Sequence, residues 1–171
     1  RPWCGPRRAR MTDAPGFRIG VRLALDWGQA RIGVAACDAH GTLAYPVETI
    51  AGASDLVAVG RRLRALVAEY EPIEILLGLP RHLKGVEGAA AGGVREKAAW
   101  LASEFPTVGV RLIDERLTTV VASRQLRAAG RAAKGQRAVI DQVAAVAILE
   151  QALEVERNTG LPGGEPVTER T

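Results

Sequence analysis

The chain has 171 residues, of which 47% are hydrophobic and 25% are charged. This length and composition suit one globular domain with a full hydrophobic core, and they exclude a disordered or fibrous protein. The formal net charge is +4 and the isoelectric point is about 9.6, which favours an acidic partner such as nucleic acid without requiring one.

The chain has two cysteines, Cys4 and Cys37, and neither belongs to a CxxC motif or a Cys/His cluster. Neither a zinc site nor a redox pair is therefore predicted, and this cysteine usage fits a reducing cytoplasm. No apolar run approaches the length of a membrane span, and the first residues contain no apolar signal-peptide core. We expect a cytoplasmic protein with no membrane partner.

Changes in composition at both ends predict one folded domain, residues 18–157. Residues 1–17 are rich in Arg and Pro and are expected to form a flexible extension, within which Met11 is a candidate start of translation. Residues 158–171 are rich in Gly and Pro and are expected to be a disordered tail. Neither an internal repeat nor a second domain is predicted.

Three strands are predicted first. Apolar residues alternate with others along residues 18–27, Gly28 interrupts the pattern, and residues 31–37 resume it, which predicts a β-hairpin. A short turn leads to a third strand at residues 43–50, in which Pro46 indicates an edge position or a bulge.

Helices and strands alternate in the rest of the chain. Ser54 is expected to cap a helix that ends at Tyr70, and the almost wholly apolar strand 73–79 is expected to be buried on both faces. The remaining predicted elements are a helix at 89–104, a strand at 108–114, and helices at 118–129 and 138–156. This order predicts an α/β fold in which a five-stranded mixed sheet is flanked by helices.

Three acidic residues stand out by their positions. Asp26 ends the apolar run of the first strand, Glu115 follows the fifth strand, and Asp141 begins an otherwise apolar helix face. Each has an ordinary alternative role: Asp26 can open a turn, and the other two can interact favourably with a helix dipole. Together they suggest three carboxylates that converge at one edge of a sheet, where α/β proteins gather their ligands.

Carboxylate oxygens suit hard divalent cations such as Mg²⁺ or Mn²⁺. Two such ions, about 3.5–4 Å apart, can clamp the attacking and leaving oxygens of a phosphodiester. The hypothesis is therefore a two-metal nuclease in which Asp26, Glu115 and Asp141 are the catalytic metal ligands and no histidine is needed as a base.

No acidic residue occurs between Arg116 and Ile140. The basic residues of that span are Arg116, Arg124, Arg127, Arg131, Lys134 and Arg137. They can form a solvated helix face, but such a face normally mixes charges of both signs. We interpret the stretch as a surface for nucleic-acid phosphates beside the metal site. Aromatic residues are only 4% of the chain, so base stacking is not the expected main contact.

The chain resembles the YqgF family, also called RuvX, from about Arg18 to Glu156. The matching motifs are LALDWGQARIGVA at the first hairpin, ILLGLP closing the fourth strand, Gly85, Glu87 and Gly88 in the next loop, DERLTT after the fifth strand, and VIDQVAAVAIL in the last helix. The resemblance implies an RNase H-like fold and a small metal-dependent nuclease, linked in bacteria to maturing the 5′ end of pre-16S rRNA. Similarity to the RuvC resolvases suggests cleavage of Holliday junctions as a second activity.

The acidic positions of the family fall on Asp26, Glu115 and Asp141. Asp114 is expected to orient groups around Glu115. The candidate nucleic-acid contacts are Arg31, Arg81, His82, Lys84, Arg116, Thr118, Arg124, Arg127, Arg131, Lys134 and Arg137. Many members have Asn and Asp where this chain has His82 and Lys84, which adds positive charge near the site, and residues 134–137 align only loosely with the family.

Three other functions stay open. A Holliday junction resolvase needs a symmetric dimer to make paired cuts. The sequence shows no clear dimer face, so a monomer or weak homodimer is expected, with RNA favoured over branched DNA. A non-catalytic nucleic-acid-binding module would usually have lost an acidic ligand, whereas all three positions are filled here. An actin-like ATPase is disfavoured because 171 residues leave no room for its second half.

Overall fold

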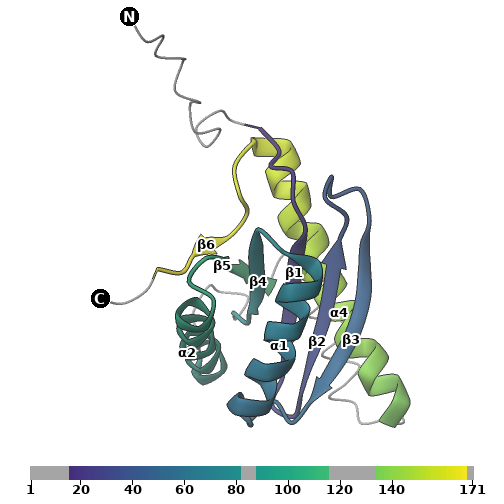
Figure 1. The fold of residues 1–171 in the computed structure, drawn as a ribbon, viewed down its shortest axis with the longest axis vertical. Coiled ribbons are helices and arrows are strands. Elements are labelled where there is room, and N and C mark those ends of the chain that lie inside the picture. The colour runs from purple at the N-terminus through teal and green to yellow at the C-terminus, as the bar shows by residue number, and fades with distance from the viewer. Residues whose placement is uncertain (1–15, 82–87, 116–133, 169–171) are drawn as a thin grey trace, which may run out of the picture.

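The computed structural model describes residues 16–81, 88–115 and 134–168 (Figure 1). Its centre is a six-stranded sheet in the order β3-β2-β1-β4-β5-β6. The strands are β1 (Arg22–Trp27), β2 (Arg31–Cys37), β3 (Ala44–Ala51), β4 (Glu74–Leu79), β5 (Gly109–Asp114) and β6 (Glu165–Pro166). The described helices are α1 (Leu56–Tyr70), α2 (Ala89–Glu104) and α4 (Lys134–Thr159). The predicted helix at 118–129 lies outside the described residues.

The sheet is mixed, as the sequence predicts. β1 pairs antiparallel with β2, and β2 with β3, whereas β1, β4 and β5 run parallel. In the chain, α1 comes between β3 and β4 and α2 between β4 and β5, which provides the crossovers that parallel strands require. α1 and α2 cover one face of the sheet and α4 covers the other (Figure 1). The predicted α/β class is confirmed.

Two hydrophobic cores separate these layers. The core under α1 and α2 includes Leu25, Leu63 and Leu101, and the core under α4 includes Ala24 and Ile148. β4 is buried along its whole length because both layers cover it, as its apolar run predicts. Successive residues of β1 enter different cores, and this alternation decides which side chains face α4.

Two local features test the sequence predictions closely. The cap of α1 is Asp55, whose Oδ1 accepts a hydrogen bond from Ala58 N at 3.1 Å, and not the predicted Ser54. Both residue types cap helices well, so the sequence does not distinguish these two neighbours. Pro46 lies in the edge strand β3, next to a register shift between Val34 and Ala35 of β2, as predicted.

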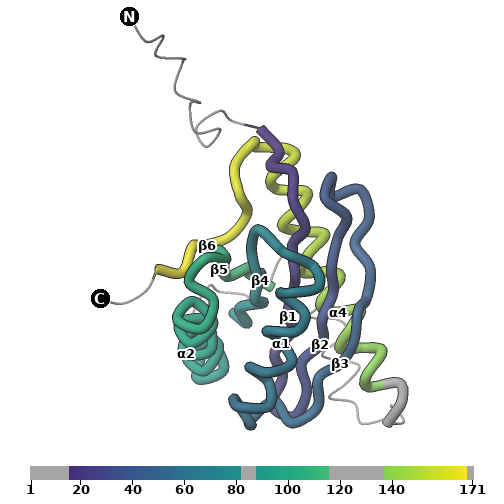
Figure 2. Tube along the Cα trace, viewed as in Figure 1, coloured from purple at the N-terminus to yellow at the C-terminus, as the bar shows by residue number. Residues whose placement is uncertain are grey.

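The sheet has six strands and not five because the C-terminal segment adds β6. α4 continues to Thr159, and the chain after it leads to β6, which pairs antiparallel with β5 (Figure 2). Leu112 pairs with Glu165, and Val167 N donates a hydrogen bond to Val110 O at 2.9 Å. The Gly and Pro content of this segment predicts disorder, but backbone pairing with β5 gives residues up to 168 a defined path.

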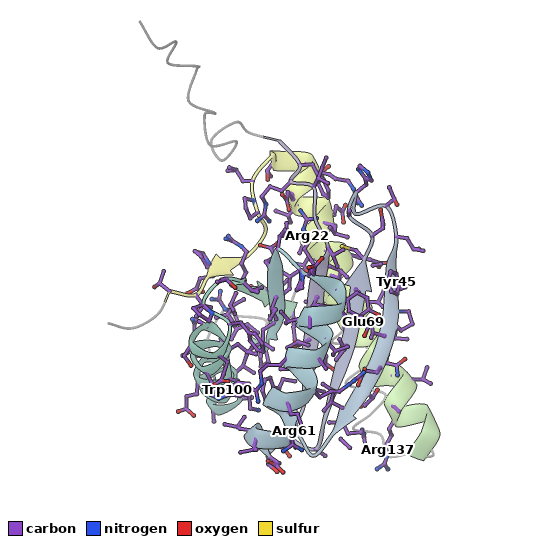
Figure 3. All side chains as sticks on the ribbon, viewed as in Figure 1. Arg22, Tyr45, Arg61, Glu69, Trp100 and Arg137 are labelled. Atoms are coloured by element: carbon purple, nitrogen blue, oxygen red, sulfur yellow. The ribbon has the colours of Figure 1, made fainter. Side chains whose placement is uncertain are left out.

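Buried ion pairs join α4 to the sheet. Arg22 and Glu156 are 1% and 2% exposed, and Arg22 Nη2 lies 2.9 Å from Glu156 Oε2. Arg18, whose side chain is 37% exposed, bridges Glu156 of α4 (Nε to Oε1, 2.7 Å) and Glu74 of β4 (Nη2 to Oε1, 2.8 Å). Burial alone would raise the pKa of Glu156, but hydrogen bonds from Arg18 and the charges of Arg22 and Arg18 outweigh burial and lower that pKa. Figure 3 shows Arg22 far from Arg137, which lies near the other end of α4.

Candidate functional site

The three predicted carboxylates are all buried. The exposed fractions are 1% for Asp26, 2% for Glu115 and 2% for Asp141. Asp26 lies near the end of β1, Glu115 directly follows β5, and Asp141 lies in the N-terminal part of α4. Burying an ionised carboxylate is costly unless charges or hydrogen-bond donors compensate for it. Three such residues from three elements therefore mark this region as more than ordinary core.

The carboxylates of Asp26 and Glu115 approach each other at Gly78. Leu25 enters the core under α1 and α2, so the next residue of β1, Asp26, faces α4. Leu25 pairs with Leu77 of β4, and one step further along the parallel pair Asp26 lies beside Gly78. A Cβ built on Gly78 would overlap Glu115 Oε1, so the Glu115 carboxylate lies directly over this glycine. The two carboxylates are therefore neighbours on one face of the sheet.

Asp141 approaches the same region from α4. Asp26 pairs with Gly33 across β1 and β2, and a Cβ built on Gly33 would overlap the backbone oxygen of Asp141. The α4 backbone thus rests on β2 at a position where only a residue without a Cβ permits this approach. We use the name glycine strip for three neighbouring residues on this face of the sheet, Gly33, Asp26 and Gly78. The backbone of Asp141 lies over Gly33 at one end, and the Glu115 carboxylate lies over Gly78 at the other.

Arg31, a predicted nucleic-acid contact, pairs with Asp141. Arg31 Nε lies 2.8 Å from Asp141 Oδ2, and the two side chains are 27% and 3% exposed. This pair joins β2 to α4 and orients the Asp141 carboxylate. Among residues 16–81, 88–115 and 134–168, no three His, Cys, Asp or Glu side chains come close enough together to hold a metal ion. The three residues therefore lie along the glycine strip, but among the described residues their side chains are not gathered into a metal-ligand cluster.

Arg81 and Asp114 lie at the ends of β4 and β5. Arg81 Nη1 is 3.7 Å from Asp114 Oδ2. The backbone oxygen of Asp114 accepts a hydrogen bond from Gln151 Nε2 at 3.3 Å, which links β5 to α4. Asp114 is predicted to orient groups around Glu115, and in the structure its carboxylate faces Arg81 while Glu115 extends over Gly78.

The other predicted nucleic-acid contacts are mostly beyond what the structure describes. Arg137 is exposed near the start of α4 (Figure 3). Lys134 begins α4, and its side chain lies outside the described residues. The remaining candidates also lie outside them: His82, Lys84, Arg116, Thr118, Arg124, Arg127 and Arg131. Their contacts with nucleic acid stay predictions.

Four residues that position the site are absent from the sequence predictions: Gly33, Gly78, Thr49 and Gln142. Thr49 Oγ1 donates a hydrogen bond to Ala138 O at 2.9 Å, and Gln142 Nε2 donates to Thr49 Oγ1 at 3.1 Å. These bonds attach the start of α4 to β3. The two glycines had a signal, because a glycine inside an apolar strand often marks a close approach of another group. Thr49 is an ordinary strand residue, and no pattern in the sequence indicates its contact with α4.

A family model described as "RuvX: Holliday junction resolvase" matches residues 20–155. The chain belongs to the RuvX family. Three relatives carry the name "Putative pre-16S rRNA nuclease". The Streptomyces coelicolor protein is 60% identical over 155 residues, 91% of this chain and 92% of the relative. The Streptomyces avermitilis protein is 60% identical, covering 89% and 97%. The Cutibacterium acnes protein is 54% identical, covering 81% and 84%.

The residues matched by the RuvX model include the three carboxylates, Arg31 and both glycines of the strip. The resemblance to this family that the sequence motifs indicate is confirmed. A solved structure named "T. thermophilus RuvC in complex with Holliday junction substrate" has a TM-score of 0.47 and 19% identity, covering 86% of this chain and 99% of that one. Within the described ranges, no helix has the length and apolar character needed to cross a membrane.

Proposed function

We propose that this RuvX protein is a nuclease that hydrolyses phosphodiester bonds of RNA in the 5′-end processing of pre-16S rRNA. The convergence of buried Asp26, Glu115 and Asp141 on the glycine strip carries the proposal. The names of relatives 54% to 60% identical to this chain support RNA as the substrate. The proposed compartment is the cytoplasm, which the cysteine usage favours.

The chemistry of the three carboxylates fits hard divalent cations although their side chains stand apart in this structure, and we propose two ions, Mg²⁺ or Mn²⁺. Carboxylate oxygens are the ligands that such ions prefer, and Asp26, Glu115 and Asp141 would hold them. When bound, the ions supply Lewis acidity that polarises the phosphoryl oxygens. Cations would also offset the cost of burying three carboxylates, which Arg31 offsets in part for Asp141.

The protein's own residues bind and orient. β1 fixes Asp26 in the sheet, Gly78 allows Glu115 to approach it, and Arg31 orients Asp141. Among the described arginines, we assign the binding of a substrate phosphate to Arg81, and its position at the end of β4 beside Asp114 supports this role. Such cation–phosphate contacts hold a polyanion in register with the reacting groups.

The test is cleavage of labelled single-stranded RNA and a four-way DNA junction, side by side, with Mg²⁺, Mn²⁺ or chelator. Wild-type protein is expected to cut RNA with either ion and not with chelator. Asp26→Asn keeps the side-chain shape and should lower the rate about 100-fold or more. Glu69→Gln is the matched control, because Glu69 is an exposed carboxylate of α1 on the opposite side of the sheet (Figure 3). Undiminished cleavage by Asp26→Asn would indicate a non-catalytic binding module.

A Holliday junction resolvase is the second candidate, because the family model carries that description. Resolution needs a symmetric dimer. Paired nicks in the junction with RNA intact, together with a dimer mass in solution, would favour this activity over RNA processing.

A further inference from the structure

One carboxylate of the C-terminal segment is shared by two arginines. Arg95 of α2 holds Glu165 through two contacts, Nη1 to Oε1 at 3.1 Å and Nη2 to Oε2 at 3.2 Å. Arg81 Nη2 lies 3.8 Å from the same Oε2. Two parallel contacts from one guanidinium are the geometry by which arginine binds carboxylates and phosphates alike. Glu165 thus occupies a place that an anionic oxygen pair fits.

This place adjoins the candidate catalytic site. Arg81 Nη1 lies 3.7 Å from Asp114 Oδ2, and Asp114 immediately precedes Glu115. In α/β proteins ligands gather at the carboxyl ends of parallel strands, and Arg81 and Asp114 stand at those ends of β4 and β5. A nucleic acid whose scissile phosphate approached Glu115 would therefore bring a neighbouring phosphate toward Arg81.

We propose that Arg81 and Arg95 form a binding site for one backbone phosphate of the nucleic-acid substrate, and that Glu165 fills this site in the absence of substrate. The inference rests on the proposed function. Carboxylate and phosphate each present paired oxygens to a guanidinium, so substrate can take the place of Glu165. The Glu165 side chain is 51% exposed and that of Arg95 is 35% exposed, and ion pairs this exposed contribute little stability, so the exchange is easy.

The C-terminal segment stays attached without this carboxylate. Arg111 donates hydrogen bonds to the backbone oxygens of Gly163 at 2.7 Å and Gly164 at 2.8 Å, and Leu112 pairs with Glu165 through the backbone. Between the segment and α2 lies a cavity of about 360 Å³ lined by Arg95, Leu112, Glu165 and Val167 among others. The Glu165 side chain has room to move while β6 stays paired, so Glu165→Gln removes the charge without removing the strand.

The experiment measures binding of a labelled single-stranded RNA in chelator by fluorescence anisotropy. Four full-length proteins are compared: wild type, Glu165→Gln, Arg95→Gln and the double variant. Glu165→Gln is expected to tighten Kd about 3- to 10-fold and to steepen the dependence of log Kd on log salt by about one. Arg95→Gln should weaken RNA binding more in the Glu165→Gln background than in the wild type. In the wild type the Glu165 carboxylate pairs with Arg95 and so competes with the RNA phosphate for it.

Glu104→Gln is the matched control, because it removes an exposed carboxylate paired with Arg64 at 2.9 Å, away from the site. If Glu165→Gln changed Kd no more than Glu104→Gln, or if Arg95→Gln had equal effects in both backgrounds, the phosphate site would be refuted. In either case RNA cleavage by the wild type would leave the proposed function intact.

If the wild type neither bound nor cut RNA or junction DNA, both proposals would fail together. The same pattern with junction DNA would support the phosphate site and change only the substrate.

Discussion

Gly78→Ala tests whether the Glu115 carboxylate lies over β4. A Cβ at this position would overlap Glu115 Oε1 and lie 2.6 Å from Ile148 Cδ1, whereas ordinary van der Waals contact begins at 3.4 Å. Both neighbours must move by about 1 Å, which in a close-packed core costs roughly 1–3 kcal/mol of unfolding free energy. Because Glu115 is a proposed metal ligand, we expect a displacement of that size to lower the cleavage rate about 100-fold. We expect cleavage to fall far more than the loss of stability explains.

Urea unfolding and RNA cleavage, the latter under conditions where the variant is folded, separate these two effects. Gly92→Ala is the matched control, because a Cβ there meets nothing within 4 Å and α2 favours alanine over glycine by about 1 kcal/mol. The control should keep its cleavage rate and lose no stability. Wild-type stability and wild-type cleavage in Gly78→Ala would show that Glu115 does not lie over Gly78.

Three further predictions concern stability. Gly33→Ala should lower Tm more than Gly78→Ala, because its Cβ overlaps the backbone of α4 and not the tip of a side chain; an unchanged Tm would contradict the close approach. Arg31→Gln should lower the unfolding free energy by about 1–3 kcal/mol, which is less than the cost of breaking a fully buried pair because Arg31 is partly exposed. In an Asp141→Asn background the same substitution should cause no such loss, and a double-mutant cycle measures this difference. The pKa of Glu156 in the folded protein lies below its ordinary value, so the stability that this carboxylate contributes is present above the ordinary pKa and is lost as the pH falls through the folded-state pKa. Urea titrations from about pH 6 to pH 3 should show this decline, and Glu156→Gln should flatten it.

Local patterns in the sequence determined most of the elements. β2 and α2 have the bounds that their patterns predict, and β4 is buried on both faces as its apolar run indicates. Hydrophobic periodicity is a local property, because it reflects which side of each element meets the core. The sequence also singled out Asp26 and Asp141, since an acidic residue in an apolar stretch needs a special environment.

The tertiary structure alone decided which of these residues meet. Arg31 and Asp141 are 110 residues apart, and Arg95 and Glu165 are 70 apart, so no local pattern pairs them. The meeting of Glu115 with Gly78 depends on the register between parallel strands, which the composition of one strand does not encode. β6 has the composition of a disordered tail and becomes a strand only because the edge of β5 offers it backbone hydrogen bonds.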